Sequence, residues 1–174
     1  MSEWEGYILE DYKYYFEPET LVLDVGCGHG SQMKELIQQG SMAIGVDLDF
    51  AALEYCRSQE LSVLRAYAEL VPLKDSSLDG ILCKVVLPYT REEQVIREFG
   101  RLLKPGARCY LNCHGAGYYL KYLLLSRSWK QRFYGLRSLV NTWMWVITGH
   151  RLPGFLGDTI YQSCLLYTSD AADE

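Results

Sequence analysis

The chain has 174 residues, of which 49% are hydrophobic and 22% are charged, and its formal net charge is −5. These values are typical of one globular domain and argue against an intrinsically disordered chain. The acidic balance argues mildly against a nucleic-acid-binding protein. No run of about 18 uncharged apolar residues occurs, so we expect no membrane-spanning helix. The N-terminus is acidic and aromatic, so we expect no signal peptide.

The six cysteines form no Cys-x-x-Cys pair, and three of them lie in apolar runs that predict strands. Buried thiols are therefore expected rather than a disulfide framework or a metal site. This pattern indicates a reducing, cytoplasmic environment.

The first two thirds of the chain alternate between predicted strands and helices. Residues 3–16 are acidic and aromatic, and their three-and-four spacing predicts a short helix on the domain. Short apolar runs predict buried strands over residues 21–25, 42–46, 61–66, 80–86 and 107–113. Helices are predicted over residues 31–39, 51–58 and 91–103, the last stopped by Lys104-Pro105-Gly106.

This alternation predicts an α/β fold with a doubly wound, mostly parallel sheet. The strands are continuously apolar, as expected where helices cover both faces of a sheet. Ligands of such sheets bind outside the carboxyl ends of the strands, which locates the site before any motif is considered.

Residues 117–148 interleave aromatic and basic side chains and predict two or three helices, broken near Gly135 and ended by Gly149. Residues 115–163 carry six Lys or Arg against one acidic residue, Asp158. Three interpretations remain open for this segment. It packs on the sheet with its basic residues solvated, it forms a lid over an acceptor, or it contacts a membrane surface.

A glycine-rich loop joins the first predicted strand to the first helix. Residues 23–30 read Leu-Asp-Val-Gly-Cys-Gly-His-Gly, and Asp47 ends the second strand. Glycines allow a tight turn and a close approach of the backbone to a ligand. A carboxylate at the tip of the second strand is suited to the hydroxyls of a ribose. Both features are also compatible with a dinucleotide.

The spacing of the glycines in this loop argues against a dinucleotide. The glycines follow Gly-x-Gly-x-Gly rather than Gly-x-Gly-x-x-Gly, and Asp24 lies inside the strand, where a nicotinamide fingerprint usually has no carboxylate. An NAD(P)-dependent oxidoreductase is therefore the alternative enzyme class rather than the leading one.

In its glycine loop, Asp24 and Asp47, the chain resembles the class I S-adenosylmethionine-dependent methyltransferases. The resemblance is to the type 11 group, which includes ubiquinone- and menaquinone-biosynthesis methyltransferases. Four segments carry it over residues 21 to about 113, in the family's order. They are the loop at 23–30, Gly-Val-Asp-Leu-Asp at 45–49, Ala-Glu-Leu-Val-Pro-Leu at 68–73, and Arg-Leu-Leu-Lys-Pro-Gly at 101–106.

The resemblance implies S-adenosylmethionine as the cofactor and gives roles to the glycine loop. Asp24 would orient the loop and the methionine amino group. Gly26, Cys27, Gly28 and Gly30 would lie beneath the cofactor and contact it through the backbone.

It also implies which residues hold the nucleoside. Asp47 would bind the ribose, and Leu48 would pack on the adenine. Ala68 and Glu69 would lie beside the adenine edge. The family often has Asp before this Ala-Glu pair, and this chain has Tyr67.

At the end of the fourth strand, Cys83 and Lys84 would face the methionine part of the cofactor. His114 follows the fifth strand and is the leading candidate for a general base or a substrate contact. No metal site is expected.

These features predict methyl transfer to oxygen, carbon or nitrogen of a small-molecule or lipid-like acceptor. A truncated, inactive cofactor-binding fragment is the non-enzyme alternative. We expect no nucleic-acid partner, and a cytoplasmic or membrane-peripheral location, with membrane contact through residues 117–148.

The expected organisation is a helical segment at 1–20, a cofactor-binding α/β core at 21–114, and a helical lid or substrate segment at 115–163. Residues 164–174 read like a translated transposase-type sequencing adapter. We therefore expect that the natural sequence diverges near Ser163 and that the usual C-terminal antiparallel strands are missing.

Overall fold

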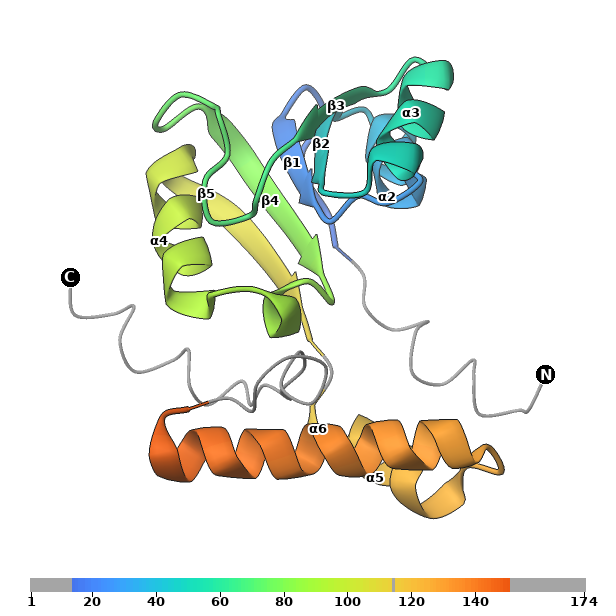
Figure 1. Ribbon diagram of the computed structural model, residues 1–174. Helices are drawn as coiled ribbons and strands as arrows, with labels where there is room; N and C mark the ends of the chain where they lie inside the picture. Colours follow the sequence, from blue (N-terminus) through green and yellow to red (C-terminus); the bar gives the residue numbers. More distant parts are fainter. Residues whose placement is uncertain (1–13, 114, 151–174) are drawn as a thin grey trace. The chain divides into compact units, whose positions relative to one another are not determined.

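The computed structural model describes residues 14–113 and 115–150 of the chain (Figure 1). Five strands form one sheet in the order β3-β2-β1-β4-β5. Their bounds are Leu21–Val25 (β1), Met42–Asp47 (β2), Ser62–Arg65 (β3), Leu78–Lys84 (β4) and Leu103–Asn112 (β5). Helices α2 (Ser31–Gln38), α3 (Phe50–Ser58) and α4 (Glu92–Leu102), and the 3-10 helix η1 (Leu87–Tyr89), lie between the strands in the chain.

Parallel pairing aligns the tips of the first strands. β1 pairs with β2 so that Asp24 lies opposite Gly45, and β2 pairs with β3 so that Asp47 lies opposite Arg65. Because these strands are parallel, their carboxyl ends lie at one edge of the sheet. The predicted α/β class and the parallel crossover connections are confirmed.

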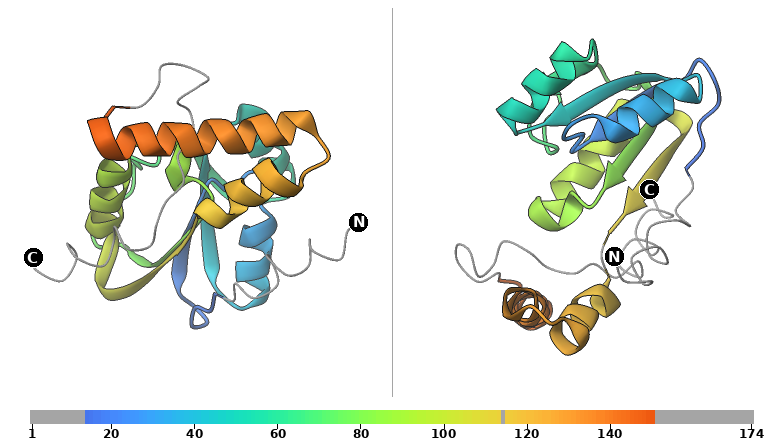
Figure 2. Two further views of the ribbon diagram at one scale, coloured as in Figure 1. Left: turned by 90° about the horizontal axis from the view of Figure 1, so that it is seen from below. Right: turned by 90° about the vertical axis from the view of Figure 1, so that its right-hand side faces the viewer.

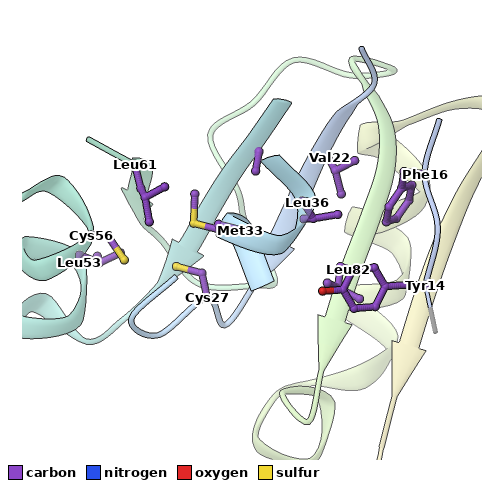
Figure 3. Close-up of a cluster of buried hydrophobic side chains, with 11 residues drawn as sticks. Tyr14, Phe16, Val22, Cys27, Met33, Leu36, Leu53, Cys56, Leu61 and Leu82 are labelled. Carbon is purple, nitrogen blue, oxygen red and sulfur yellow. The ribbon is translucent and has the colours of Figure 1, made fainter. Parts of the chain in front are cut away.

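The residues divide into two compact units. Among the described residues, the first contains 14–67, Val71–Leu82 and Phe99–Tyr110, and the second contains Ala68–Leu70, Cys83–Glu98, 111–113 and 115–150. The first unit holds a core cluster drawn from β1, β2, β4, α2 and α3 (Figure 3). Val22, Met33, Leu36, Leu53 and Leu82 are fully buried in it, so burial of apolar side chains between these helices and strands stabilises the unit.

The segment before β1 is not helical where the structure describes it. Residues 14–16 are irregular, and Tyr14 and Phe16 are nevertheless buried in the core cluster. Tyr14 donates a hydrogen bond to Glu35 Oε2 at 2.5 Å, and the Phe16 ring stands edge-on to Tyr110 at a centroid distance of 5.1 Å. The helical prediction for residues 3–16 is therefore wrong at 14–16, and its remainder lies outside the described residues.

Strand β5 begins four residues earlier than the sequence predicts. Helix α4 ends at Leu102, close to the expected stop, but the chain enters the strand at once at Leu103. Proline has no N–H to donate, and strands tolerate it at the edge of a sheet. β5 occupies an edge among the described strands, so Pro105 fits within it.

The segment after β5 contains two helices, α5 (Ala116–Leu125) and α6 (Trp129–Thr148). The predicted break at Gly135 is wrong, since α6 continues through this residue and the chain turns instead at 126–128. The end at Gly149 is confirmed, because this glycine caps α6 with a φ of 67°. Figures 1 and 2 show α5 lying alongside α6. None of the described helices is long and apolar enough to cross a membrane.

Gly135 allows the close approach of α5 and α6. A Cβ atom at this position would lie 2.5 Å from the Tyr119 carbonyl oxygen and 3.0 Å from the Leu123 amide nitrogen. Both atoms belong to the backbone of α5, so no side chain can move aside to make room. Close packing, rather than a helix break, accounts for glycine here.

We predict that Gly135→Ala destabilises the helix pair. Alanine favours an isolated helix by about 1 kcal/mol, but the clash is with backbone that cannot move aside, so overpacking costs about 2–3 kcal/mol, the upper part of its range, and the net effect is a loss of about 1–2 kcal/mol. Urea unfolding followed by circular dichroism measures it. Gly117→Ala in α5 is the matched control, because a Cβ there meets no atom within 4 Å. Equal or greater stability of Gly135→Ala would contradict the close-packing role.

Candidate functional site

The loop between β1 and α2 is a compact turn held by its own backbone. Gly26, Gly28 and Gly30 have φ values of 73°, 49° and 78°, in the left-handed region that favours glycine. The amides of Gly26 and Cys27 donate to the Val46 carbonyl at 2.8 and 3.2 Å, which fastens the loop to the end of β2. Gly30 N donates to the Cys27 carbonyl at 2.8 Å and closes the turn before α2.

The Asp47 carboxylate joins this loop to the turn that follows β2. Oδ2 accepts a hydrogen bond from Gly28 N at 2.8 Å. Oδ1 accepts from Leu48 N at 2.7 Å and from Asp49 N at 2.9 Å. One side chain therefore fixes two neighbouring strand tips relative to each other, through hydrogen bonds to an ionisable acceptor that are stronger than neutral ones.

Sulfur-containing side chains pack beneath the loop (Figure 3). Cys27 and Met33 lie against Gly45, where a Cβ atom would be 2.7 Å from Cys27 Sγ and 2.5 Å from Met33 Sδ. Cys56 of α3 donates from Sγ to the Gly28 carbonyl at 3.2 Å. The cysteine of the loop therefore points into the core, so what it offers to a ligand is its backbone.

Burial raises the pKa of the Cys27 thiol to about 12, with smaller contributions from Asp24, Cys56 and Asp47. Burial also raises the pKa of Cys56. Both side chains are therefore protonated at neutral pH, and they act in packing and hydrogen bonding rather than as nucleophiles.

The remaining predicted residues of the first unit differ in exposure. Asp24 is buried at the end of β1, whereas Leu48 is exposed directly after Asp47. His29 is exposed in the loop and stands edge-on to the Tyr55 ring at 5.4 Å, which is consistent with a packing role. Asp24, the glycine loop, Asp47 and Leu48 thus belong to one edge of the first unit.

The other predicted site residues belong to the second unit. Ala68 and Cys83 are buried, Glu69 and Lys84 are half-buried, and Glu69 Oε1 accepts a hydrogen bond from Arg91 N at 2.9 Å, just before α4. His114 lies outside the described residues. Within 14–113 and 115–150, no three His, Cys, Asp or Glu side chains are grouped so as to hold a metal ion.

A cluster of tyrosines in the second unit was not singled out as a group by the sequence. Tyr118 and Tyr122 share a hydrogen bond of 3.0 Å, and the hydroxyls of Tyr89 and Tyr134 lie 3.5 Å apart. Tyr119 is buried between Tyr118 and Tyr134, with ring centroids at 5.3 and 5.7 Å. Burial, aided by neighbouring tyrosines, raises the pKa of Tyr118 and Tyr119, so these hydroxyls stay protonated at neutral pH.

Arg101 has a role that its motif did not reveal. Its guanidinium donates to the carbonyls of Val71 and Leu73 at 3.0 and 2.9 Å and pairs with Asp75. The Arg-Leu-Leu-Lys-Pro-Gly segment therefore holds the Val-Pro-Leu segment by hydrogen bonds. Two of the four motif segments are thus in direct contact.

The sequence of residues 23–111 matches the family model described as a methyltransferase domain. This range begins in β1, ends in β5, and contains the whole of the glycine loop and Asp47. The chain belongs to the methyltransferase domain family. The match favours methyl transfer over the nicotinamide-dependent alternative.

Two curated relatives of this methyltransferase domain are named for biosynthetic pathways. The biotin biosynthesis bifunctional protein BioHC of Cellvibrio japonicus is 32% identical over 132 residues, which cover 69% of this chain and 26% of that protein. The ubiquinone biosynthesis O-methyltransferase of Idiomarina loihiensis is 27% identical over 160 residues, covering 87% of this chain and 60% of that protein. The matched part of the chain thus covers about a quarter of the length of the first relative and three fifths of the length of the second.

Solved structures agree on the fold. The YcgJ protein from Bacillus subtilis aligns with a TM-score of 0.54 and 26% identity, covering 62% of this chain and 53% of that one. A methyltransferase from Methanosarcina mazei described as S-adenosylmethionine-dependent aligns with a TM-score of 0.60 and 24% identity, covering 84% of this chain and 73% of that one. The methyltransferase domain therefore has the Rossmann-like fold of this enzyme class.

We predict that Gly30→Ala destabilises the first unit more than Gly28→Ala. A Cβ at Gly30 would lie 2.5 Å from Leu61 Cδ1 and 3.1 Å from Cys56 Sγ, whereas one at Gly28 meets nothing within 4 Å. Both changes strain a left-handed residue by about 1–2 kcal/mol, and the first adds about 1–3 kcal/mol of overpacking. Urea unfolding of both variants measures the difference. Equal losses of stability would contradict the packing role of Gly30.

Proposed function

We propose that this methyltransferase domain binds S-adenosylmethionine at the β1–α2 loop and Asp47 and transfers its methyl group to a small-molecule or lipid-like acceptor. The observation that carries the proposal is the Asp47 carboxylate, which accepts Gly28 N at 2.8 Å and Leu48 N at 2.7 Å. A carboxylate that can accept hydrogen bonds from hydroxyls thus lies beside an exposed stretch of glycine backbone.

The residues of this edge fit a nucleoside. Gly26 is exposed and Gly28 has open space where a side chain would lie, so a ligand can approach their backbone closely. Asp47 Oδ2 accepts one hydrogen bond in the structure, and a carboxylate oxygen has two acceptor positions, so one remains for a hydroxyl. Leu48 is exposed next to it and offers an apolar surface to a base.

The sulfonium cofactor supplies an already activated methyl group. The protein therefore has to align the acceptor and exclude water, and a general base is required only for an acceptor that arrives protonated. His114 remains our prediction for that base. The protonated tyrosines of the second unit are suited to donating hydrogen bonds to an acceptor rather than to removing its proton.

The acceptor class rests on two lines of support. The relatives named for biotin and ubiquinone biosynthesis favour a metabolic intermediate rather than a macromolecule. The tyrosine cluster formed by η1, α5 and α6 combines aromatic faces with hydroxyls, which suits an acceptor with an apolar body and polar substituents. Oxygen, carbon and nitrogen all remain candidates for the methylated atom.

We predict that Asp47→Ala weakens binding of S-adenosylhomocysteine at least tenfold. Each charge-assisted hydrogen bond that is lost is worth about 1.5–3 kcal/mol. Isothermal titration calorimetry measures the affinity. Asp49→Ala is the matched control, because this neighbouring carboxylate accepts Ala51 N at 2.9 Å at the start of α3. That variant is expected to lose about 1 kcal/mol of stability and to keep its affinity.

Unchanged affinity in Asp47→Ala would rule out the ribose role, and uptake of NAD in place of S-adenosylhomocysteine would favour the oxidoreductase alternative. Transfer of labelled methyl groups into a cell extract then tests activity. Binding of the cofactor without any transfer would indicate the inactive fragment.

Gly28→Ala tests the backbone approach at the same site. We expect at least a tenfold loss of S-adenosylhomocysteine affinity, because the new methyl group occupies the open space over the loop. Circular dichroism checks that the variant is folded at the temperature of the titration. Retention of parental affinity would show that the ligand does not lie against Gly28.

A further inference from the structure

Helix α6 distributes its polar and apolar side chains in the opposite way to an ordinary surface helix. Its buried side carries the polar residues Arg137, Ser138, Asn141 and Thr142. Its exposed side carries large apolar residues, namely Trp129, Phe133, Leu136, Val140, Trp143 and Ile147. A water-facing helix normally shows the opposite arrangement.

The exposed apolar residues form one continuous stripe. They recur at intervals of three or four positions over a helix of 20 residues, so they lie on one face and extend for about 30 Å. Trp129 and Trp143, near the two ends, are 73% and 67% exposed. Leu120, Leu124 and Leu125 of α5 are also exposed. Apolar patches of this extent on a soluble protein mark an interaction surface.

The charged residues of α5, α6 and the turn between them have a single sign. Residues 115–150 contain five Lys or Arg and no Asp or Glu. Arg127, Lys130 and Arg132 are exposed at the start of α6 and in the turn before it. An occupant with negative charge and an apolar interior complements this surface, and the tryptophans suit the boundary between headgroups and acyl chains.

Two other roles for the stripe, a membrane-spanning helix and a contact with a second copy of the chain, fit these observations less well. A spanning helix is excluded for the described residues, because none of their helices is long and apolar enough. A second copy of the chain would bring basic residues of both copies to one interface, while α5 and α6 supply no carboxylate to neutralise them.

We infer that the exposed stripe of α6 docks the domain in the plane of an anionic membrane surface. The apolar side chains enter the outer acyl region, and Arg127, Lys130 and Arg132 contact acidic headgroups. Docking is independent of methyl transfer, so its test requires neither cofactor nor acceptor.

Co-sedimentation of the 174-residue chain with lipid vesicles tests the inference. We expect binding to vesicles of phosphatidylcholine mixed with phosphatidylglycerol, weaker binding to phosphatidylcholine alone, and a decline with rising salt as the charges are screened. A blue shift of tryptophan fluorescence on binding, reduced in Trp143→Phe, provides a second readout.

Leu136→Glu is the decisive variant, with an expected loss of binding of at least tenfold, because a charge enters the apolar stripe. Ile37→Glu is the matched control. It places the same charge at an exposed apolar position of α2. Ile37 is 47% exposed and Leu136 is 48% exposed, so the two sites are comparable. Lys130→Glu combined with Arg132→Glu is expected to remove the preference for anionic vesicles. Circular dichroism confirms that each variant is folded.

Three outcomes would overturn the inference. They are absence of binding to anionic vesicles, equal binding to neutral ones, and parental binding by Leu136→Glu. Sedimentation velocity tests the alternative that a second copy of the chain binds the stripe. A dimer that Leu136→Glu dissociates, in a chain that ignores vesicles, would assign the stripe to a second copy.

Discussion

One carboxylate at the tip of β2 determines the shape of the candidate site. Asp47 accepts hydrogen bonds from the amides of Gly28, Leu48 and Asp49 and so fixes the glycine loop against the turn before α3. The loop is otherwise a run of residues that favour no single conformation in isolation. The same side chain that organises the edge is the one that we propose binds the ribose.

Support from beneath the loop complements this constraint. Cys56 hydrogen-bonds to the Gly28 carbonyl, and Gly30 and Gly45 have no Cβ where the side chains of Leu61, Met33 and Cys27 fill the space. The loop is therefore held by polar contacts at its rim and by dense packing below. A turn that is fixed from both sides loses little conformational freedom when a ligand binds, which favours affinity.

The sequence predicted the parallel strands, the three crossover helices and the residues of the loop, because apolar runs and glycine spacing are local signals. It misplaced the start of β5 at Ala107 and predicted a helix break at Gly135. In both cases the preference of a proline or glycine was outweighed by tertiary context, an edge position for Pro105 and a close helix contact for Gly135. The roles of Cys56 and Arg101 were not predicted, because each acts through hydrogen bonds to backbone carbonyls, which leave no pattern in the sequence.

The contacts that organise the glycine loop all come from a short stretch of chain. The loop from Gly26 to Gly30 and its contacts Val46, Asp47, Cys56 and Leu61 fall within 36 consecutive residues, and β1 pairs with β2 after a single crossover helix. Assembly of this edge thus has a small loop-closure entropy. During synthesis on the ribosome, the edge that carries the glycine loop and Asp47 is expected to take shape soon after Leu61 leaves the exit tunnel, before α5 and α6 have been translated.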